Sequence, residues 1–347
     1  MRDKLFKISG FIVLATSVVL AWFAMEYSTY LKTPMNIPEQ GLRYEIKSGM
    51  TLTSVARDLS QQGVLNKPVY LRVLAKFQGT ASNIQAGEYE FSVGLTPAGF
   101  LDMIVSGQVI QYALTIVEGW NYTQLMEAVN NHEHLVHTLK GLDQKQLMSK
   151  LGYPGEHPEG RFYPDTYLFP TDTTDSEFLK RAYEAMVNIL NEEWSQRVGA
   201  LPFDTPYEAL ILASIVEKET AVPDERKAIS GVFVRRLEKK MRLQTDPTVI
   251  YGMGDKYDGN IKLRDLKKDT PYNTYRRKGL PPTPIAMPGG AAINAALHPL
   301  EGDELYFVAR GDGSHEFSST LKQHNNAVIK YQLKGRRKSF SSNPAGK

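Results

Sequence analysis

One predicted helix, over residues 206–219, constrains the fold of this chain most strongly. Thr205 and Glu208 have the spacing of an N-terminal capping box, and Pro206 suits the first helical position, where a missing N–H costs nothing. Residues 209–216 are apolar on every face of this helix. A helix of that kind has no polar side to give to solvent, so we expect it to lie buried in a core.

The same helix ends in two carboxylates, Glu217 and Glu219. Burial and the partial negative charge of a helix C-terminus both disfavour the ionised form, so both should raise a carboxyl pKa. A carboxylic acid that stays protonated near neutral pH can act as a general acid. The alternative from this local pattern is that both glutamates simply face solvent at a helix end.

Composition excludes several classes of function. The chain has 347 residues, enough for two or three domains, and a net charge of +3 with basic and acidic residues interspersed, so no nucleic-acid partner is predicted. It has no cysteine, which excludes disulfides, thiolate metal sites and a cysteine nucleophile. A phosphate-binding glycine loop, a Gly-x-Ser-x-Gly elbow and a His-Glu-x-x-His motif are all missing. We therefore predict neither a cofactor nor a metal site.

The N-terminus carries a candidate membrane anchor. Arg2, Lys4 and Lys7 precede residues 8–25, which contain no charge and are long enough to span a bilayer. No small-residue cleavage site follows. The cations on the N-terminal side place that end in the cytoplasm. We expect a single-pass anchor with the rest of the chain exported; the alternative, a cleaved signal peptide, also exports it.

Short strand–turn–helix units follow a predicted linker at 28–42. Residues 44–59 read as a strand, a glycine turn and a helix, with an echo at 116–129 and a weaker third copy at 94–105. The first unit resembles the LysM module, whose signature includes a Gly-x-Thr-Leu turn, here residues 49–52. That module binds glycans containing N-acetylglucosamine. A packing domain without glycan contact is the alternative.

Residues 155–171 contain three prolines and four aromatic residues, including Tyr163. Such a loop is rigid, and aromatic faces are what sugar rings stack on, although the same residues could form an aromatic plug over the core. Further along, the pattern predicts helices at 176–198 and 223–242 and two strands near 305–308 and 316–318.

Polar residues cluster in two later segments. They are Gln244, Thr245 and Asp246, followed by Tyr272, Asn273 and Thr274. Their amides and hydroxyls could bind a polar ligand. Alternatively, they are polar loops that hydrogen-bond to one another.

Several segments together resemble the MltG (YceG-like) family of endolytic murein transglycosylases. They read ASIVEKE at 213–219, LQTDPTVIYG at 243–252, YNTY at 272–275, and GLPP at 279–282 through PG at 288–289. Glu159-Gly160 and the PDTY segment at 164–167 also fit. The resemblance extends from the anchor to about residue 330, in the order of the family.

The resemblance implies a chemistry. The family cuts the MurNAc–GlcNAc β-1,4 bond of peptidoglycan without water, because the MurNAc 6-hydroxyl attacks the anomeric carbon and leaves a 1,6-anhydro ring. The catalytic acid/base then falls on Glu217, and Glu219 becomes a supporting group. Since the substrate supplies the nucleophile, one carboxyl group can serve first as acid and then as base. The two polar clusters would hold N-acetyl groups and orient the 6-hydroxyl.

The expected protein is thus a membrane-anchored α+β enzyme of the bacterial inner (plasma) membrane, with its catalytic domain extracytoplasmic. Its partners would be peptidoglycan glycan strands and peptidoglycan synthases (penicillin-binding proteins), and it would help to terminate nascent strands. Two alternatives stay open: a hydrolase with Asp246 or Glu219 as a second carboxylate, and a non-catalytic peptidoglycan-binding scaffold of the envelope. The predicted organisation is anchor with cytoplasmic tip 1–27, linker 28–42, LysM-like domain 43–112, catalytic domain 113–335 and disordered tail 336–347.

Overall fold

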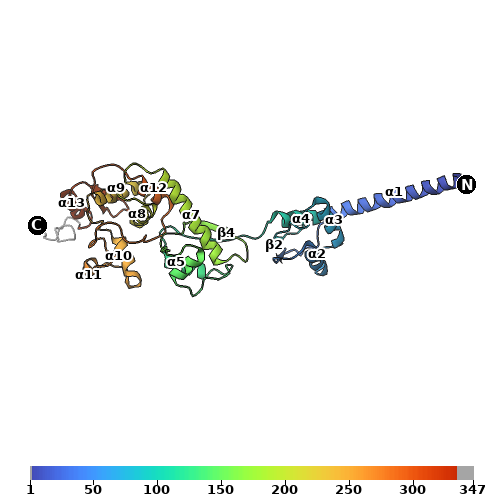
Figure 1. The fold of residues 1–347 in the computed structure, drawn as a ribbon, viewed down its shortest axis with the longest axis horizontal. Coiled ribbons are helices and arrows are strands. Elements are labelled where there is room, and N and C mark those ends of the chain that lie inside the picture. Colours follow the sequence, from blue (N-terminus) through green and yellow to red (C-terminus); the bar gives the residue numbers. More distant parts are fainter. Residues whose placement is uncertain (1, 334–347) are drawn as a thin grey trace. The chain divides into compact units, whose positions relative to one another are not determined.

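The computed structural model describes residues 2–333 and is a mixed α+β structure (Figure 1). The chain divides into two compact units. One holds residues up to 112 together with 168–172, and the other holds 113–167 together with 173 onward. The tail predicted to be disordered, 336–347, lies outside the described residues.

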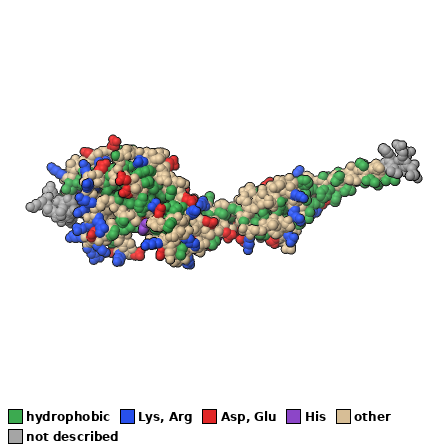
Figure 2. Space-filling model, viewed as in Figure 1, with side chains coloured by type: hydrophobic (Ala, Val, Ile, Leu, Met, Phe, Trp, Pro, Cys, Tyr) green, Lys and Arg blue, Asp and Glu red, His purple; other side chains and the backbone are tan. Residues whose placement is uncertain are grey.

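The first unit begins with the long helix α1 (Arg2–Lys32). Within it, Lys7–Lys32 has a mean hydropathy of 2.1 and is long enough to cross a membrane. Its apolar side chains lie on the surface, as Figure 2 shows. The predicted linker is wrong at its start, because residues 28–32 are helical. Tyr27 and Tyr30 extend the helix by packing edge-to-face on the ring of Tyr70.

The rest of this unit is a small α+β fold. Its elements are β1 (Leu42–Ile46), α2 (Leu52–Gln61), α3 (Pro68–Gln78), β2 (Gly87–Phe91) and α4 (Pro97–Ser106). The two strands pair antiparallel with Tyr44 opposite Tyr89. The predicted first strand–turn–helix is confirmed: Gly49 takes a positive φ of 85°, and Thr51 caps α2. Its likeness to a LysM module stays a prediction.

The second unit is mostly helical. Its elements are β3 (Tyr112–Thr115), α5 (Tyr122–Asn130), α6 (Gln144–Leu151), β4 (Thr166–Phe169), α7 (Asp175–Ser195), α8 (Pro206–Glu219), α9 (Arg226–Glu238), α10 (Asp246–Met253), α11 (Leu263–Lys267), α12 (Gly290–Leu297), β5 (Tyr306–Ala309), β6 (His315–Ser318) and α13 (Leu321–Tyr331), with 3-10 turns at Pro223–Glu225 and Gly254–Lys256. The first residue of β3 and the last two of β4 are counted with the first unit. Strands β3 and β4 form one two-stranded sheet, and β5 and β6 form an antiparallel hairpin.

Two local expectations need correction. The strand of the echo at 116–129 is displaced, because β3 ends at Thr115 before the echo begins, although its helix α5 is present. The segment 155–171 is not a loop throughout, because it contains the strand β4, in which alternate residues are buried. The strand pair predicted near 305–308 and 316–318 is confirmed as β5 and β6.

Helix α8 is the centre of the second unit, as its apolar sequence predicts. The Thr205 side chain accepts a hydrogen bond from the Glu208 N–H in the expected capping box. All residues from Ala209 to Val216 are buried, including the one polar residue, Ser214. Helices α7, α9, α10 and α12 pack around α8. Its C-terminus is thereby held in a fixed position within this unit.

Ser214 ties α8 to a distant loop. Its hydroxyl donates to the Ile211 carbonyl (2.7 Å) and accepts from the buried N–H of Ile285 (3.0 Å). Ile285 lies in the buried stretch 283–289, which ends at Gly289. One side chain in the middle of α8 therefore fixes the approach of the segment that reaches the helix end.

We predict that Ser214→Ala lowers the free energy of unfolding by about 1–3 kcal/mol, because it leaves the buried Ile285 N–H without an acceptor. Ser195→Ala is the matched control. The Ser195 hydroxyl also donates to the carbonyl three residues earlier, but it is exposed. Guanidinium denaturation followed by tryptophan fluorescence measures both variants. Equal unfolding midpoints for the two would contradict the assigned role of Ser214.

Candidate active site

Glu217 lies where the buried α8 meets the surface of the unit. Its side chain is only 7% exposed, and its Oε2 accepts a hydrogen bond from the Gly289 N–H at 3.0 Å. Arg226 reaches its Oε1 at 3.9 Å. Burial raises the pKa of Glu217, and the negative charge of Glu118 raises it further, against the opposing effects of Gly289 and Arg226. The raised pKa that the sequence predicts is therefore confirmed.

Glu118 is a second carboxylate at this site, and the sequence analysis missed it. A Cβ atom placed on Gly289 would overlap the Glu118 carboxylate, so this carboxylate occupies the space that a side chain at 289 would need. The same Gly289 donates its N–H to Glu217. The two carboxylates therefore flank a single glycine, and Glu118 is the exposed one of the two.

The loop that carries Glu118 is held by backbone hydrogen bonds. The Gly119 N–H donates to the Met287 carbonyl (2.8 Å), and the Met287 N–H donates to the Trp120 carbonyl (2.7 Å). The Lys218 ammonium donates to the Gly119 carbonyl at 3.1 Å. Three separate segments, at the end of α8, before α5 and before α12, are thus joined around Glu217.

Tyr163 lies at the same place. The Tyr163 hydroxyl lies close to Gly290, at the start of α12, and burial raises the pKa of this phenol. A cavity of about 470 Å³ adjoins this point and is lined in part by Gly290, Arg226 and Asn294. The Arg226 Nε is buried and has no hydrogen-bond partner among the described residues. Arg226 therefore connects the cavity that it lines with the Glu217 carboxyl group that it approaches.

Glu219 has different surroundings. The Thr245 hydroxyl donates to its Oε1, and burial raises the pKa of Glu219 to about 7. Asp246 raises the pKa further, whereas His315 and Arg236 lower it. Glu217 and Glu219 thus contact different elements, as a rotation of about 200° over two helical residues leads one to expect.

The first predicted polar cluster packs under Glu219. The Thr245 N–H donates to the Thr274 hydroxyl (3.1 Å), which also pairs with the Thr248 hydroxyl (2.9 Å). Thr245 and Thr274 are buried and bond to each other, and Thr245 also bonds to Glu219. Gln244 and Asp246 are exposed, with Gln244 at a positive φ of 55° and Asp246 accepting from the Tyr275 hydroxyl at 2.6 Å. These two side chains are accessible to a ligand.

The second cluster is largely occupied with internal contacts. The Asn273 amide donates to the carbonyls of residues 265, 266 and 268, and so closes the end of α11. The Tyr272 hydroxyl pairs with Thr283 at 2.9 Å, and its ring packs edge-to-face on Tyr251. These contacts favour a supporting role for both residues.

Glu159 is a buried carboxylate to which the sequence analysis gave no role. It is 2% exposed, and it accepts hydrogen bonds from the Tyr122 N–H (3.0 Å) and the Tyr251 hydroxyl (2.9 Å). Burial raises its pKa to about 7. Because Tyr122 begins α5, Glu159 fixes the helix that follows the Glu118 loop. The only sequence signal was its place in the Glu159-Gly160 pair.

A family model now adds to this geometry. The model of the YceG-like family matches residues 44–330. The chain belongs to the YceG-like family.

Three relatives of this YceG-like chain are informative. A protein of Bacillus subtilis (strain 168) named endolytic murein transglycosylase is 32% identical, over 86% of this chain and 85% of its own length. One of Streptococcus pneumoniae (strain D39) with the same name is 26% identical over 94% of this chain and 65% of its own length. A crystal structure of a YceG-like protein from Listeria monocytogenes, 29% identical, matches with a TM-score of 0.53 and covers 83% of this chain and 99% of that one.

The donor groups of this YceG-like chain do not assemble a metal site in the part of the chain that the structure describes. Between residues 2 and 333 no group of three or more His, Asp or Glu is arranged to hold a metal ion. The chemistry that the described residues can supply is that of carboxyl groups, hydroxyls and backbone amides around Glu217.

Glu219 yields a prediction about stability and pH. Its pKa is raised from 4.5 to about 7 in the folded state, so its protonated form stabilises the fold below pH 4.5 and this contribution is lost as pH rises through 7. As pH rises from 4.5 to 7, the wild type should therefore lose about 3 kcal/mol of unfolding free energy that Glu219→Gln does not lose. Chemical denaturation at a series of pH values measures the difference.

Glu177→Gln is the control for this measurement. Hydrogen bonds from Thr174 lower the pKa of Glu177, so its contribution is present above pH 4.5 and lost as pH falls. The difference between this variant and the wild type should therefore have the opposite sign and change only at acidic pH. A flat difference for Glu219→Gln between pH 4.5 and 7 would contradict the raised pKa.

Proposed function

We propose that this chain is a peptidoglycan lytic transglycosylase that cleaves the β-1,4 bond between MurNAc and GlcNAc within glycan strands. One observation carries the proposal: Glu217, at the end of a buried helix, has a raised pKa, shares Gly289 with a second carboxylate, and pairs with Arg226, which lines a cavity. Membership of the YceG-like family and the names of the relatives support it.

In the proposed reaction, Glu217 acts twice. As a carboxylic acid it donates its proton to the glycosidic oxygen, and the bond from the MurNAc anomeric carbon to that oxygen breaks. As a carboxylate it then takes the proton of the MurNAc 6-hydroxyl while this oxygen bonds to the anomeric carbon. The proton lost in the first step is regained in the second, and no water is consumed.

Glu118 fits two tasks in this scheme. Its negative charge raises the pKa of Glu217 and so keeps the acid protonated before cleavage. Positive charge develops at the anomeric carbon when the glycosidic bond breaks. An exposed carboxylate next to the acid is placed to stabilise that charge.

Glu118 also gives a reason to keep the hydrolase alternative. An ordinary glycosidase needs two carboxylates flanking the bond, and Glu118 with Glu217 would form such a pair. This pair differs from the one considered from the sequence, where Asp246 or Glu219 was the second group. Glu219 fits that role less well, because the Thr245 hydroxyl occupies its Oε1. The products distinguish the two reactions.

The remaining predicted residues divide by accessibility. Tyr163 lies beside the cavity and is proposed to contact a sugar ring. Gln244 and Asp246 are exposed and are proposed to bind N-acetyl or hydroxyl groups. We assign the others to support of the site: Glu219, Thr245, Tyr272, Asn273 and Thr274.

The proposed location follows from α1. It would anchor the chain in the bacterial plasma membrane with the N-terminus in the cytoplasm, because Arg2, Lys4 and Lys7 precede the apolar run. A reporter fused after residue 40 tests this orientation, and cytoplasmic reporter activity would refute it. The LysM-like domain 43–112, the catalytic domain 113–335, the partner synthases and the termination of nascent strands stay part of the same proposal.

The first test concerns Glu217. Glu217→Gln keeps the shape of the side chain but cannot transfer the proton, so activity on purified sacculi should fall by at least ~10²–10⁴-fold. Glu219→Gln, the matched control on the same helix, should keep measurable activity. Mass spectrometry of the wild-type digest should find MurNAc ends one water lighter than hydrolysis gives. Reducing-end MurNAc would favour the hydrolase, and no cleavage by the wild type would favour the scaffold.

The second test concerns the charge of Glu118. Because this charge raises the pKa of Glu217, Glu118→Gln should lower that pKa and move the alkaline limb of the pH–rate profile to lower pH. Glu127→Gln is the control, since Glu127 is exposed on the helix that follows the loop. If the limb stays in place and the rate falls equally at every pH, the charge of Glu118 does not affect the pKa of Glu217.

A further inference from the structure

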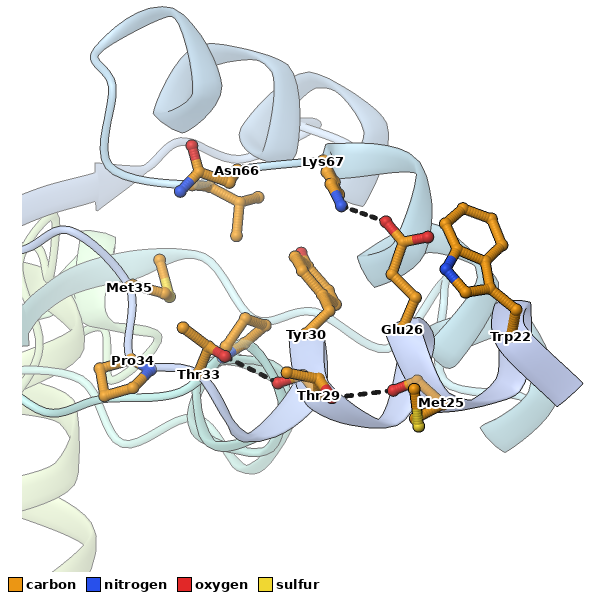
Figure 3. A pocket seen from close by; sticks show the side chains of 12 residues that line it. Trp22, Met25, Glu26, Thr29, Tyr30, Thr33, Pro34, Met35, Asn66 and Lys67 are labelled. Atoms are coloured by element: carbon orange, nitrogen blue, oxygen red, sulfur yellow. Dashed lines mark hydrogen bonds and ion pairs between the residues drawn. The ribbon is translucent and has the colours of Figure 1, made fainter.

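A second cavity, of about 420 Å³, lies far from Glu217 in sequence, where the end of α1 meets the turn before α3 (Figure 3). Trp22, Met25, Glu26 and Tyr30 line it from α1, and Lys67 lines it from the turn. It belongs entirely to the unit that contains α1. The proposed catalytic function makes no use of it.

The wall that α1 contributes is fixed by aromatic packing. Phe23, Tyr27 and Tyr30 each contact the ring of Tyr70 on α3 edge-to-face, with centroids 5.6, 5.7 and 5.3 Å away. Such contacts favour one relative position of the two helices. The cavity is therefore part of the folded unit.

Two buried oxygen atoms at this cavity have no hydrogen-bond partner among the described residues. Tyr30 is 9% exposed, and its hydroxyl is unpaired. The Oε2 of Glu26 is likewise buried and unpaired, while its Oε1 forms an ion pair with the Lys67 ammonium. Figure 3 shows Tyr30 and Glu26 both directed from α1 toward Lys67. A ligand that satisfies these atoms must offer at least one hydrogen-bond donor.

The opposite wall favours an anion. Lys67 is the N-cap of the 11-residue helix α3, has a positive φ of 48°, and makes no side-chain cap. The N-terminus of a helix carries partial positive charge, which adds to that of the Lys67 ammonium. Pro68 opens α3 without an N–H, and the Tyr70 N–H already bonds to the Lys67 carbonyl, so the ammonium is the main donor on this wall. A phosphate group is the common ligand of such an arrangement.

The position of the cavity along α1 indicates a lipid. Glu26 directly follows the apolar run 8–25, so it lies at the level where a bilayer changes from acyl chains to headgroups. Trp22 and Met25 are 60% and 68% exposed and extend the cavity toward the apolar side. The ligand should therefore carry both a polar headgroup and an apolar chain.

We propose that this cavity binds the headgroup of a zwitterionic phospholipid that bears a primary amine. Its phosphate would contact the Lys67 ammonium and the Tyr30 hydroxyl, and its ammonium would donate to Glu26. The charges of Lys67 and Glu26 cancel, so a zwitterion fits better than an anionic headgroup, which Glu26 would repel. A choline headgroup has no N–H to donate to Glu26.

Native mass spectrometry of the full-length, delipidated protein in detergent tests the proposal. Phosphatidylethanolamine, phosphatidylcholine and phosphatidylglycerol with the same acyl chains are titrated in parallel. We expect the ethanolamine lipid to bind best, and Tyr30→Phe to weaken it about fivefold, as the loss of one hydrogen bond does. Glu26→Gln should abolish the preference over phosphatidylcholine.

Tyr27→Phe is the matched control, because the Tyr27 hydroxyl is also unpaired but does not line the cavity. Equal affinity for the three lipids, or equal effects of Tyr27→Phe and Tyr30→Phe, would overturn the proposal. Glycerophosphoethanolamine is a further arm: if this soluble headgroup binds as tightly as the lipid, the ligand is not a membrane component. Thermal melting verifies that each variant is folded. Activity on sacculi does not enter this test, so its outcome is independent of the catalytic proposal.

Discussion

The hydrogen bond from the Gly289 N–H to Glu217 joins the two parts on which the site is built. On one side is α8, whose side chains are buried from Ala209 to Val216 and which cannot move without opening the core. On the other is the segment that begins at Ile285 and is tied to α8 through Ser214. The position of the carboxyl group is thus set by packing that extends along the whole helix.

The electrostatics of the site arise from an imbalance between opposing effects. Arg226 and the Gly289 N–H favour the charged form of Glu217, but burial and the neighbouring Glu118 outweigh them. Glu159, which is buried, and Glu219, which is partly buried, both have pKa values raised to about 7 by burial in the same unit. The described residues therefore include three carboxyl groups that burial biases toward the neutral state, and Glu217 is the one that pairs with the cavity-lining Arg226.

The sequence predicted those features whose cause is local. The capping box at Thr205 and the apolar run after it determined α8, and the two glutamates at its end followed from helical geometry. Glu118 was missed because its loop reaches Gly289 through backbone hydrogen bonds between segments far apart in the chain, which no local pattern encodes. The extension of α1 to Lys32 was missed for a similar reason, since it depends on aromatic contacts with Tyr70. For Asn273 and Thr274 the residue types suggested polar contacts, but only the structure shows that these contacts are internal.

The close approach at Gly289 has a consequence for how this chain can change. The Glu118 carboxylate is the flexible end of an exposed side chain, and it fills the space of a side chain at 289. A larger residue at 289 would push this carboxylate aside, and with it a charge that acts on Glu217. Substitution at 289 can therefore change the electrostatics of the acid without any change at position 118.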